Sequence, residues 1–223
     1  MSTPKVICND ARTVLPTLPD GAFDWIVTDP PYTPTSHYCY LLLGEEAPRL
    51  LADGGWLVVY AGKMYLDQVM AALGRSLRWF WLFAERHEHQ WPRIFSRRIL
   101  QRSKPVLIFT KGKPRRMAWM ADEIEAPVAK SRHPWEQAID LPLLLFQKLA
   151  RPGEWVLDPF CGTGTTLVAA QMAGLRAVGI DCDAEAVKVA RARLQGVKPC
   201  PLLAAGSRRT NAHWLGLAAA KER

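Results

Sequence analysis

Residues 156–166, Val-Leu-Asp-Pro-Phe-Cys-Gly-Thr-Gly-Thr-Thr, connect an expected strand over 155–158 to an expected helix over 165–173. Gly162 and Gly164 allow the backbone to turn sharply and to lie close to a ligand. The free N–H groups at the start of the following helix favour an anionic group. A strand, a glycine turn and a helix in this order predict an α/β fold with a mostly parallel sheet.

A second strand-to-loop junction lies near the N-terminus. The apolar run 23–28 ends at Asp29-Pro30-Pro31-Tyr32, where the prolines prevent a sheet interior or a helix from continuing. In open α/β sheets, ligands bind at the carboxyl ends of the strands. We therefore expect these four residues at the same edge as the glycine turn.

The four residues suit an exocyclic amino group, which has two protons to place. The Asp29 carboxylate can accept one proton in a hydrogen bond and the Pro30 carbonyl the other, while Pro31 fixes its own φ and so holds that carbonyl. Tyr32 offers a flat face for a base taken out of the stack. These bonds would direct the nitrogen lone pair at a methyl group. The alternative is a rigid Pro-Pro turn with an aspartate cap.

The ligand of the glycine turn differs from a dinucleotide. That fingerprint needs a third glycine where Leu167 stands, and Asp181 ends the next expected strand, where an acid commonly holds ribose hydroxyls. An adenosine-type ligand without a pyrophosphate fits both facts. A tight strand–helix turn with a capping acid would explain them as well.

The remaining chain continues the alternation of strands and helices. Asp183 is a plausible N-cap for a helix with Val187, Ala190, Arg191 and Leu194 on one face. Other strands are expected over 6–8, 56–61, 77–84, 105–110 and 176–180, and helices over 11–15, 41–51, 65–73 and 135–149. Residues 111–133 lack a clear pattern and are expected to be an irregular loop.

Positive charge is concentrated in one segment. The 223 residues carry a net charge of +8, and residues 85–116 hold ten Lys or Arg against two Glu, a difference of +8. Such a segment commonly follows a phosphate backbone, although a solvated basic face is the alternative. Five cysteines without a CxxC pair argue against a disulfide framework or a structural zinc site, and no metal is expected. No apolar run approaches ~20 residues, and no signal-peptide layout opens the chain.

The two motifs together, with Asp29–Tyr32 before Phe160–Gly164, resemble the permuted β class of S-adenosylmethionine (AdoMet)-dependent DNA amino-methyltransferases, the N6-adenine/N4-cytosine family. The likeness covers residues 5–195, including Asn9-Asp10, 53–59, 105–112 and 133–137. Gln137-Ala138 departs from it, because the family usually has a lysine-proline pair there. The resemblance implies a Rossmann-like methyltransferase fold with a mostly parallel central sheet, AdoMet as cofactor and DNA as partner.

The resemblance also implies roles for single residues. The catalytic group would be Asp29, Pro30, Pro31 and Tyr32. Asp10 would bind the cofactor's adenine (an Asx turn is the alternative), Asp181 its ribose and Thr165 its methionine carboxylate. The full cofactor-binding set is Asp10, Ser131, His133, Pro134, Asp158, Phe160, Cys161, Gly162, Thr163, Gly164, Thr165 and Asp181. The expected DNA-binding residues are Arg93, Arg97, Arg98, Arg102, Lys113, Arg115 and Arg116.

The resemblance implies methyl transfer to a flipped base, and it favours adenine N6 because the motif begins with Asp, whereas that of the cytosine-N4 relatives more often begins with Ser. Cytosine N4, an RNA or protein substrate, and a non-catalytic DNA-binding relative are the alternatives. One domain is expected, with a catalytic half (1–110), a short recognition region (111–130), an AdoMet-binding half (131–196) and an extension (197–223). A cytoplasmic protein of a bacterium or phage-infected host is expected, without membrane contact. A homodimer and a cognate restriction endonuclease are possible partners.

Overall fold

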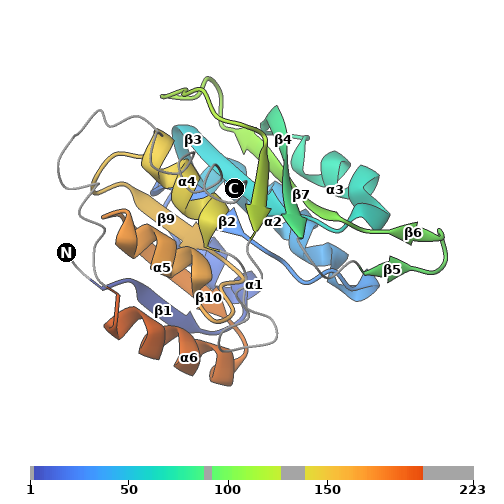
Figure 1. Ribbon diagram of the computed structural model, residues 1–223. Helices are drawn as coiled ribbons and strands as arrows, with labels where there is room; N and C mark the ends of the chain where they lie inside the picture. The colour runs from blue at the N-terminus through green and yellow to red at the C-terminus, as the bar shows by residue number, and fades with distance from the viewer. Residues whose placement is uncertain (1–2, 88–91, 127–138, 198–223) are drawn as a thin grey trace, which may run out of the picture.

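A central sheet of eight strands organises the protein (Figure 1). The computed structural model describes residues 3–87, 92–126 and 139–197. The strand order is β1-β10-β9-β2-β3-β7-β4-β8, and every neighbouring pair is parallel except those that include β7. The strands are β1 (Lys5–Cys8), β2 (Phe23–Thr28), β3 (Leu51–Tyr60), β4 (Arg78–His87), β7 (Ser103–Thr110), β8 (Glu123–Ala126), β9 (Trp155–Asp158) and β10 (Arg176–Asp181).

Helices cover both faces of this sheet. Buried side chains of α1, α2 and α3 form one apolar core with the sheet, and those of α4, α5 and α6 form the other. The helices are α1 (Ala11–Val14), α2 (His37–Leu50), α3 (Leu66–Leu73), α4 (Asp140–Leu149), α5 (Thr165–Met172) and α6 (Ala184–Gln195). With one apolar core on each face of the sheet, the arrangement is doubly wound, as expected for a largely parallel sheet.

The chain runs in opposite directions from the middle of the sheet. After β2 it passes through α2 to β3 on one side, whereas after β9 it passes through α5 to β10 on the other. β2 and β9 are neighbours, with Trp25 opposite Val156 and Ile26 opposite Leu157. The carboxyl ends of these two strands therefore form a topological switch point, the usual ligand site of such sheets.

Most elements lie where the sequence predicts them, and Phe23–Thr28 and Trp155–Asp158 have the predicted bounds. The expectation that residues 111–133 are irregular is wrong at Glu123–Ala126, which forms β8 beside β4. Ile124 packs against the apolar core, while Glu123 and Glu125 lie 2.9 and 3.6 Å from the guanidinium of Arg86. Four residues with one large apolar side chain are too short a pattern to identify a strand. Of the helix expected over 135–149, residues 135–138 lie outside the described residues.

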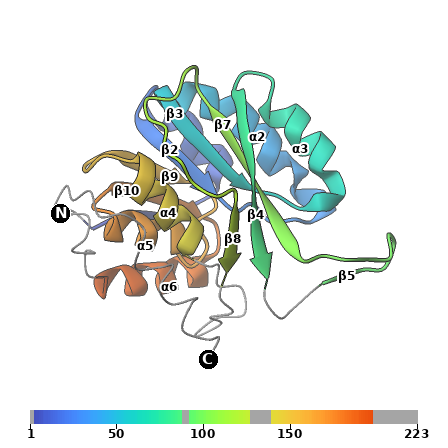
Figure 2. The ribbon, with the colours of Figure 1, turned by 45° about the horizontal axis from the view of Figure 1, so that its top comes forward.

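A short hairpin projects from the body between β4 and β7 (Figures 1 and 2). Its strands are β5 (Arg93–Ile94) and β6 (Ile99–Leu100), paired antiparallel. The turn contains Arg98 in the left-handed region, at a φ of 53°. Since β4 runs parallel to β2, the hairpin leaves the sheet at the same edge as the end of β2.

Among the described residues, none of the helices has the length and apolar character that crossing a membrane requires. Within the same residues, no three His, Cys, Asp or Glu side chains are grouped in a way that could hold a metal ion.

Candidate active site

The two motifs meet through a buried hydrogen bond. Thr28 ends β2 and Asp158 ends β9, and Thr28 Oγ1 donates to Asp158 Oδ1 at 2.7 Å. Both residues are buried. Phe160 donates its backbone N–H to the same carboxylate oxygen at 3.2 Å. Asp158 therefore ties the loop that begins at Asp29 to the loop that contains the glycines.

Burial dominates the chemistry of Asp158. It raises the pKa of this carboxyl to about 7, and the hydrogen bonds from Thr28, Thr166 and the Phe160 N–H oppose the rise. A carboxyl group in this range can be neutral or charged at cellular pH.

Asp29 lies at the carboxyl end of β2 with both of its oxygens engaged. Lys104 Nζ, from the start of β7, lies 2.7 Å from Oδ2, and the Tyr32 hydroxyl donates to Oδ1. The Asp29 side chain is 16% exposed, so it can still be reached from solvent. Burial raises the pKa of Asp29, and the ammonium of Lys104 opposes that rise. Pro30 is buried, whereas Pro31 and Tyr32 are exposed.

Lys104 occupies an unusual environment for a lysine. Its side chain is 8% exposed, and Nζ lies 4.8 Å from the ring centroid of Tyr32 and 4.7 Å from that of Tyr60. Buried Glu85 is its partner in the antiparallel register of β4 and β7. Burial raises the pKa of Glu85, and Lys104 lowers it. The sequence reasoning missed Lys104, Tyr60 and Glu85, because no motif marks a strand residue that faces inward.

The glycine turn requires glycine at two positions. Gly162 and Gly164 have φ of 48° and 84°, in the region that side chains disfavour. A Cβ on Gly164 would also lie 2.9 Å from Cβ of Ala190 in α6. Arg193, from the same helix, donates to the Thr163 carbonyl at 2.9 Å. Helix α6 therefore supports the turn from behind.

Other members of the predicted cofactor set surround this turn. Asp181 Oδ2 accepts from the Gly162 N–H at 2.7 Å, and its Oδ1 accepts from the Asp183 N–H at 2.9 Å. Thr165 and Cys161 are buried, and Phe160 is partly buried against the core. Asp181 thus stands beside the turn, at the end of β10, as the spacing in the sequence predicts.

Asp10 has a structural partner of its own. Its carboxylate accepts from the Arg12 backbone N–H at 2.8 Å and lies 2.6 Å from the Arg12 guanidinium. The first contact caps α1, which is the geometry of the Asx-turn alternative. A role for Asp10 toward adenine stays a prediction. Ser131, His133 and Pro134 lie outside the described residues.

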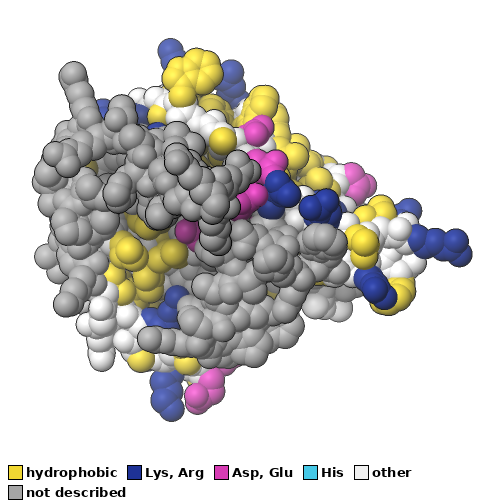
Figure 3. All heavy atoms as spheres, in the orientation of Figure 1, with side chains coloured by type: hydrophobic (Ala, Val, Ile, Leu, Met, Phe, Trp, Pro, Cys, Tyr) yellow, Lys and Arg dark blue, Asp and Glu magenta, His cyan; other side chains and the backbone are white. Residues whose placement is uncertain are grey.

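The predicted DNA-binding residues fall into two groups. Arg93, Arg97, Arg98 and Arg102 lie on the projecting hairpin or beside it, and all four are exposed. Figure 3 shows Lys and Arg side chains at the far end of this projection, next to hydrophobic ones. Phe95, in the turn, is 81% exposed. This group stands at the sheet edge that carries Asp29.

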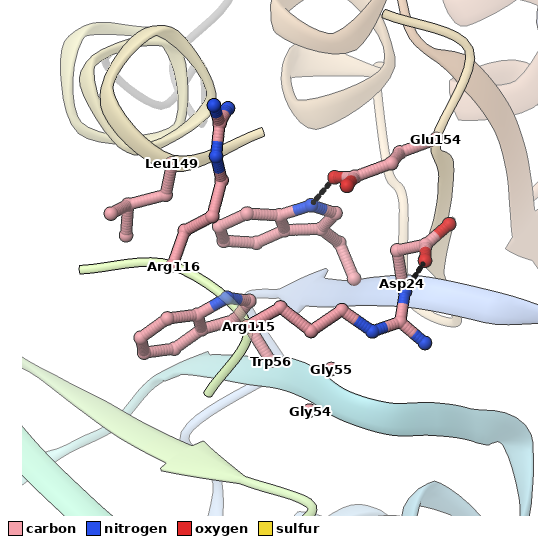
Figure 4. Close-up of a pocket in the computed structure, with 9 residues that line it drawn as sticks. Asp24, Gly54, Gly55, Trp56, Arg115, Arg116, Leu149 and Glu154 are labelled. Carbon is pink, nitrogen blue, oxygen red and sulfur yellow. Dashed lines mark hydrogen bonds and ion pairs between the residues drawn. The ribbon is translucent and has the colours of Figure 1, made fainter. Parts of the chain in front are cut away.

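The second group lies at the opposite edge of the sheet, after β7. The Arg115 guanidinium is 2.6 Å from Asp24 Oδ1, at the beginning of β2. With Arg116, Trp56 and Glu154 it lines a small pocket (Figure 4). Lys113 is exposed nearby in sequence, just beyond β7. The structure therefore does not bring Lys113, Arg115 and Arg116 together with Asp29.

Comparisons with known proteins agree on the relatives of this chain. Residues 112–192 match the family model described as DNA methylase, of the N6/N4 type. A type II methyltransferase, M.HpaI of Haemophilus parainfluenzae, is 24% identical over 85% of this chain and 74% of its own. The putative methylase YubD of Escherichia coli is 27% identical over 87% of this chain and 91% of its own.

Solved structures share the fold. PvuII DNA methyltransferase, described as cytosine-N4-specific, superposes with a TM-score of 0.75 at 16% identity, over 86% of each chain. The M1.HpyAVI–SAM complex has a TM-score of 0.68 at 23% identity, over 85% of this chain and 98% of its own. The sheet matches that of AdoMet-dependent DNA methyltransferases. The match over residues 112–192, with Asp29–Tyr32 and the glycine turn after neighbouring strands, makes the chain similar to the N6/N4 DNA methylases, the DNA amino-methyltransferases.

Proposed function

We propose that the protein transfers the methyl group of AdoMet to the N6 amino group of an adenine flipped out of DNA. The observation that carries this proposal is the juxtaposition of the two loops. Asp29 follows β2, the glycine turn follows the adjacent β9, and the bond from Thr28 to Asp158 joins them. A base held by the first loop would therefore meet a cofactor held by the second.

The residues around the glycine turn fit an adenosine-type cofactor. Asp181 can accept ribose hydroxyls with lone pairs that its two backbone hydrogen bonds leave over. Gly162 and Gly164 let the backbone approach closely, and Thr165 begins α5, where partly positive N–H groups suit a carboxylate. Phe160, Cys161, Thr163 and Asp158 complete the wall on this side. Bound AdoMet would supply a methyl group already activated by its positive sulfur.

The first loop would hold and orient the base. The Asp29 carboxylate and the Pro30 carbonyl would each accept one N–H of the amino group, and the Tyr32 ring would stack on the base. With AdoMet bound, the nitrogen lone pair would form the new N–C bond as the C–S bond breaks, and the electron pair of the C–S bond would go to sulfur. The methylated amino nitrogen would then lose one proton to water. Orientation and hydrogen bonding supply the catalysis, so no metal is required.

The projecting hairpin would bring DNA to the site. Its exposed arginines lie at the same sheet edge as Asp29 and can meet phosphates or the edges of guanine bases. The exposed ring of Phe95 can contact bases at a distorted step. A DNA duplex lying along this edge would place its backbone over the ends of β2 and β9.

Adenine is proposed on one feature, the aspartate that begins the tetrapeptide. Physically, adenine N6 and cytosine N4 need the same two acceptors, so Asp29 and Pro30 could serve either base. The likeness to the cytosine-specific PvuII enzyme concerns the fold and does not decide between them. Cytosine N4 is therefore the second candidate in the experiment below.

The test is transfer of isotope-labelled methyl from AdoMet to unmethylated DNA, followed by mass analysis of the digested nucleosides. Detection of N6-methyladenine supports the proposal. Detection of N4-methylcytosine instead would support the same reaction with cytosine as the target base. Asp29→Ala should abolish transfer and leave AdoMet binding intact, because Asp29 lies on the base side of the site. Undiminished transfer by this variant would contradict the assignment of Asp29.

A further inference from the structure

Lys104 and Tyr32 contact different oxygens of the Asp29 carboxylate. Lys104 Nζ lies 2.7 Å from Oδ2, and the Tyr32 hydroxyl donates to Oδ1. An entering amino group would replace the Tyr32 hydroxyl on Oδ1 or share that oxygen with it. The bond to Lys104 lies on the other oxygen, so it can persist while the base is bound.

The surroundings show that Lys104 is built into this place. Its ammonium lies between the rings of Tyr32 and Tyr60, at 4.8 and 4.7 Å from their centroids. The negative faces of aromatic rings stabilise a cation in this position. One face of Tyr32 is thereby taken by Lys104, which leaves the other face for a base to stack on. The lysine thus fixes the carboxylate and the ring of one tetrapeptide together.

We propose that Lys104 is a positioning residue of the methyl transfer: it keeps the Asp29 carboxylate charged and directed at the amino group of the target base. The inference rests on the proposed function, because it assigns to Asp29 the acceptor role described there. A protonated Asp29 would offer a weaker acceptor and could point a donor at the amino group. The ammonium of Lys104 opposes that state, because it lowers the pKa of the Asp29 carboxyl.

Two features of its environment act in opposite directions on the protonation of Asp29. Burial raises the pKa of its carboxyl, and the attraction of Lys104 is the main opposing influence. Among the described residues, the titratable groups that face it or its lysine come from four elements and from the tetrapeptide itself: Tyr32, Tyr40 of α2, Tyr60 of β3, Glu85 of β4 and Lys104 of β7. Asp140 of α4 faces Tyr60 and Glu85. All except Lys104 are neutral or negative, so replacing this lysine would favour protonation of Asp29.

The first experiment compares the pH dependence of kcat/KM for the wild type and Lys104→Met. We expect the acid limb of the variant to move upward by about one unit, which is a tenfold loss of kcat/KM at pH values below both limbs and little loss at pH values above them. Lys188→Met, at an exposed position of α6, is the matched control and should keep the wild-type profile. An unshifted acid limb in Lys104→Met would overturn the proposal.

Two further variants separate positioning from folding. Lys104→Arg retains the cation and should keep the acid limb of the wild type even if its kcat falls. In an Asp29→Asn background no acid ionises at position 29, so Lys104→Met should then leave the acid limb where it is. A shift of similar size in that background would contradict a role through Asp29.

A direct titration distinguishes this inference from the proposed function. The ¹³C resonance of the Asp29 carboxyl, assigned by its loss in Asp29→Asn, reports its protonation without any methyl transfer. We expect a higher titration midpoint in Lys104→Met, and, should that variant not fold, an unchanged midpoint in Lys104→Arg. An equal midpoint in Lys104→Met, or a raised one in Lys104→Arg, would refute the inference alone. Absence of methyl transfer by the wild type would refute the proposed function instead.

Discussion

Thr28 Oγ1 donates a 2.7 Å hydrogen bond to Asp158 Oδ1, which joins two residues 130 positions apart at the ends of neighbouring strands. Thr28 immediately precedes Asp29, and Asp158 stands two residues before Phe160. A displacement of either loop must therefore strain or break this buried bond. We expect this hydroxyl, together with the pairing of β2 and β9, to fix the distance between the loop that begins at Asp29 and the glycine turn.

Thr28→Val tests this bond with a side chain of the same shape. A buried acceptor that loses its donor costs about 1–3 kcal/mol of unfolding free energy, and AdoMet binding should weaken as well. Thr110→Val is the control, because Thr110 is equally buried and loses a 2.8 Å bond to the Gly112 carbonyl at the opposite edge. Urea denaturation and calorimetric titration measure the two effects. Equal losses of AdoMet affinity in both variants would count against a role at the site.

Asp158→Asn should change how stability depends on pH. The pKa of Asp158 is raised by burial to about 7, so the folded protein holds this proton more tightly than the unfolded chain does. This contribution is fully present below about pH 4 and is lost as pH rises through 7, a change on the order of 4 kcal/mol. The stability of the wild type relative to Asp158→Asn should therefore fall from pH 4 to 8. A constant difference, measured by urea denaturation, would contradict the raised pKa.

Gly164→Ala should disturb the cofactor turn for two reasons. Alanine is disfavoured at a φ of 84°, and its Cβ would lie 2.9 Å from Cβ of Ala190. Gly153→Ala is the matched control, since Gly153 has a φ of 85° and no atom within 4 Å of the added Cβ. We expect both variants to lose about 1 kcal/mol of stability from the backbone, and only Gly164→Ala to lose AdoMet affinity. Equal affinities by calorimetry would show that α6 does not support the turn.

Arg97→Ala and Arg115→Ala should show which edge of the sheet binds DNA. If Arg97 meets a phosphate, its loss makes the slope of log K against log salt shallower by about 0.9. Arg115 is paired with Asp24 at the other edge, so its removal should leave DNA binding unchanged and alter stability by no more than about 1 kcal/mol. Fluorescence anisotropy with a short duplex gives both slopes. A shallower slope in Arg115→Ala would place DNA across the opposite edge.

The fold was predictable where an apolar run is followed at once by residues that end a strand, such as proline or glycine. The strand Phe23–Thr28 ends at two prolines, and Trp155–Asp158 ends at a proline followed by the glycine turn, so both bounds follow from local chemistry. β8 was not predictable, because Ile124 is its one large apolar side chain and its pairing with β4 depends on a neighbour 39 positions away. Strand order likewise depends on contacts that no local pattern contains.

Of the candidate site, only the residues that belong to the two sequence motifs were predictable. Asp29 and the glycines belong to loops whose sequence shows their constraint, whereas Lys104 appears in the sequence as one cation among ten in a basic segment. Its burial beside Asp29 arises from the antiparallel placement of β7 against β3. The same limit applies to Arg115, which charge alone assigns to DNA and which the structure pairs with Asp24.

The position of β2 has a consequence for how the protein folds. β2 needs β9 on one side, and 126 residues lie between the end of β2 at Thr28 and the start of β9 at Trp155. During synthesis the edge of β2 that will pair with β9 stays open until most of the chain has emerged. An unpaired strand edge is a template for intermolecular association. Growth conditions that slow translation or raise the expression level should therefore favour aggregation of nascent chains. The tendency to aggregate should end when residues 155–195 dock and β9 covers the open edge of β2.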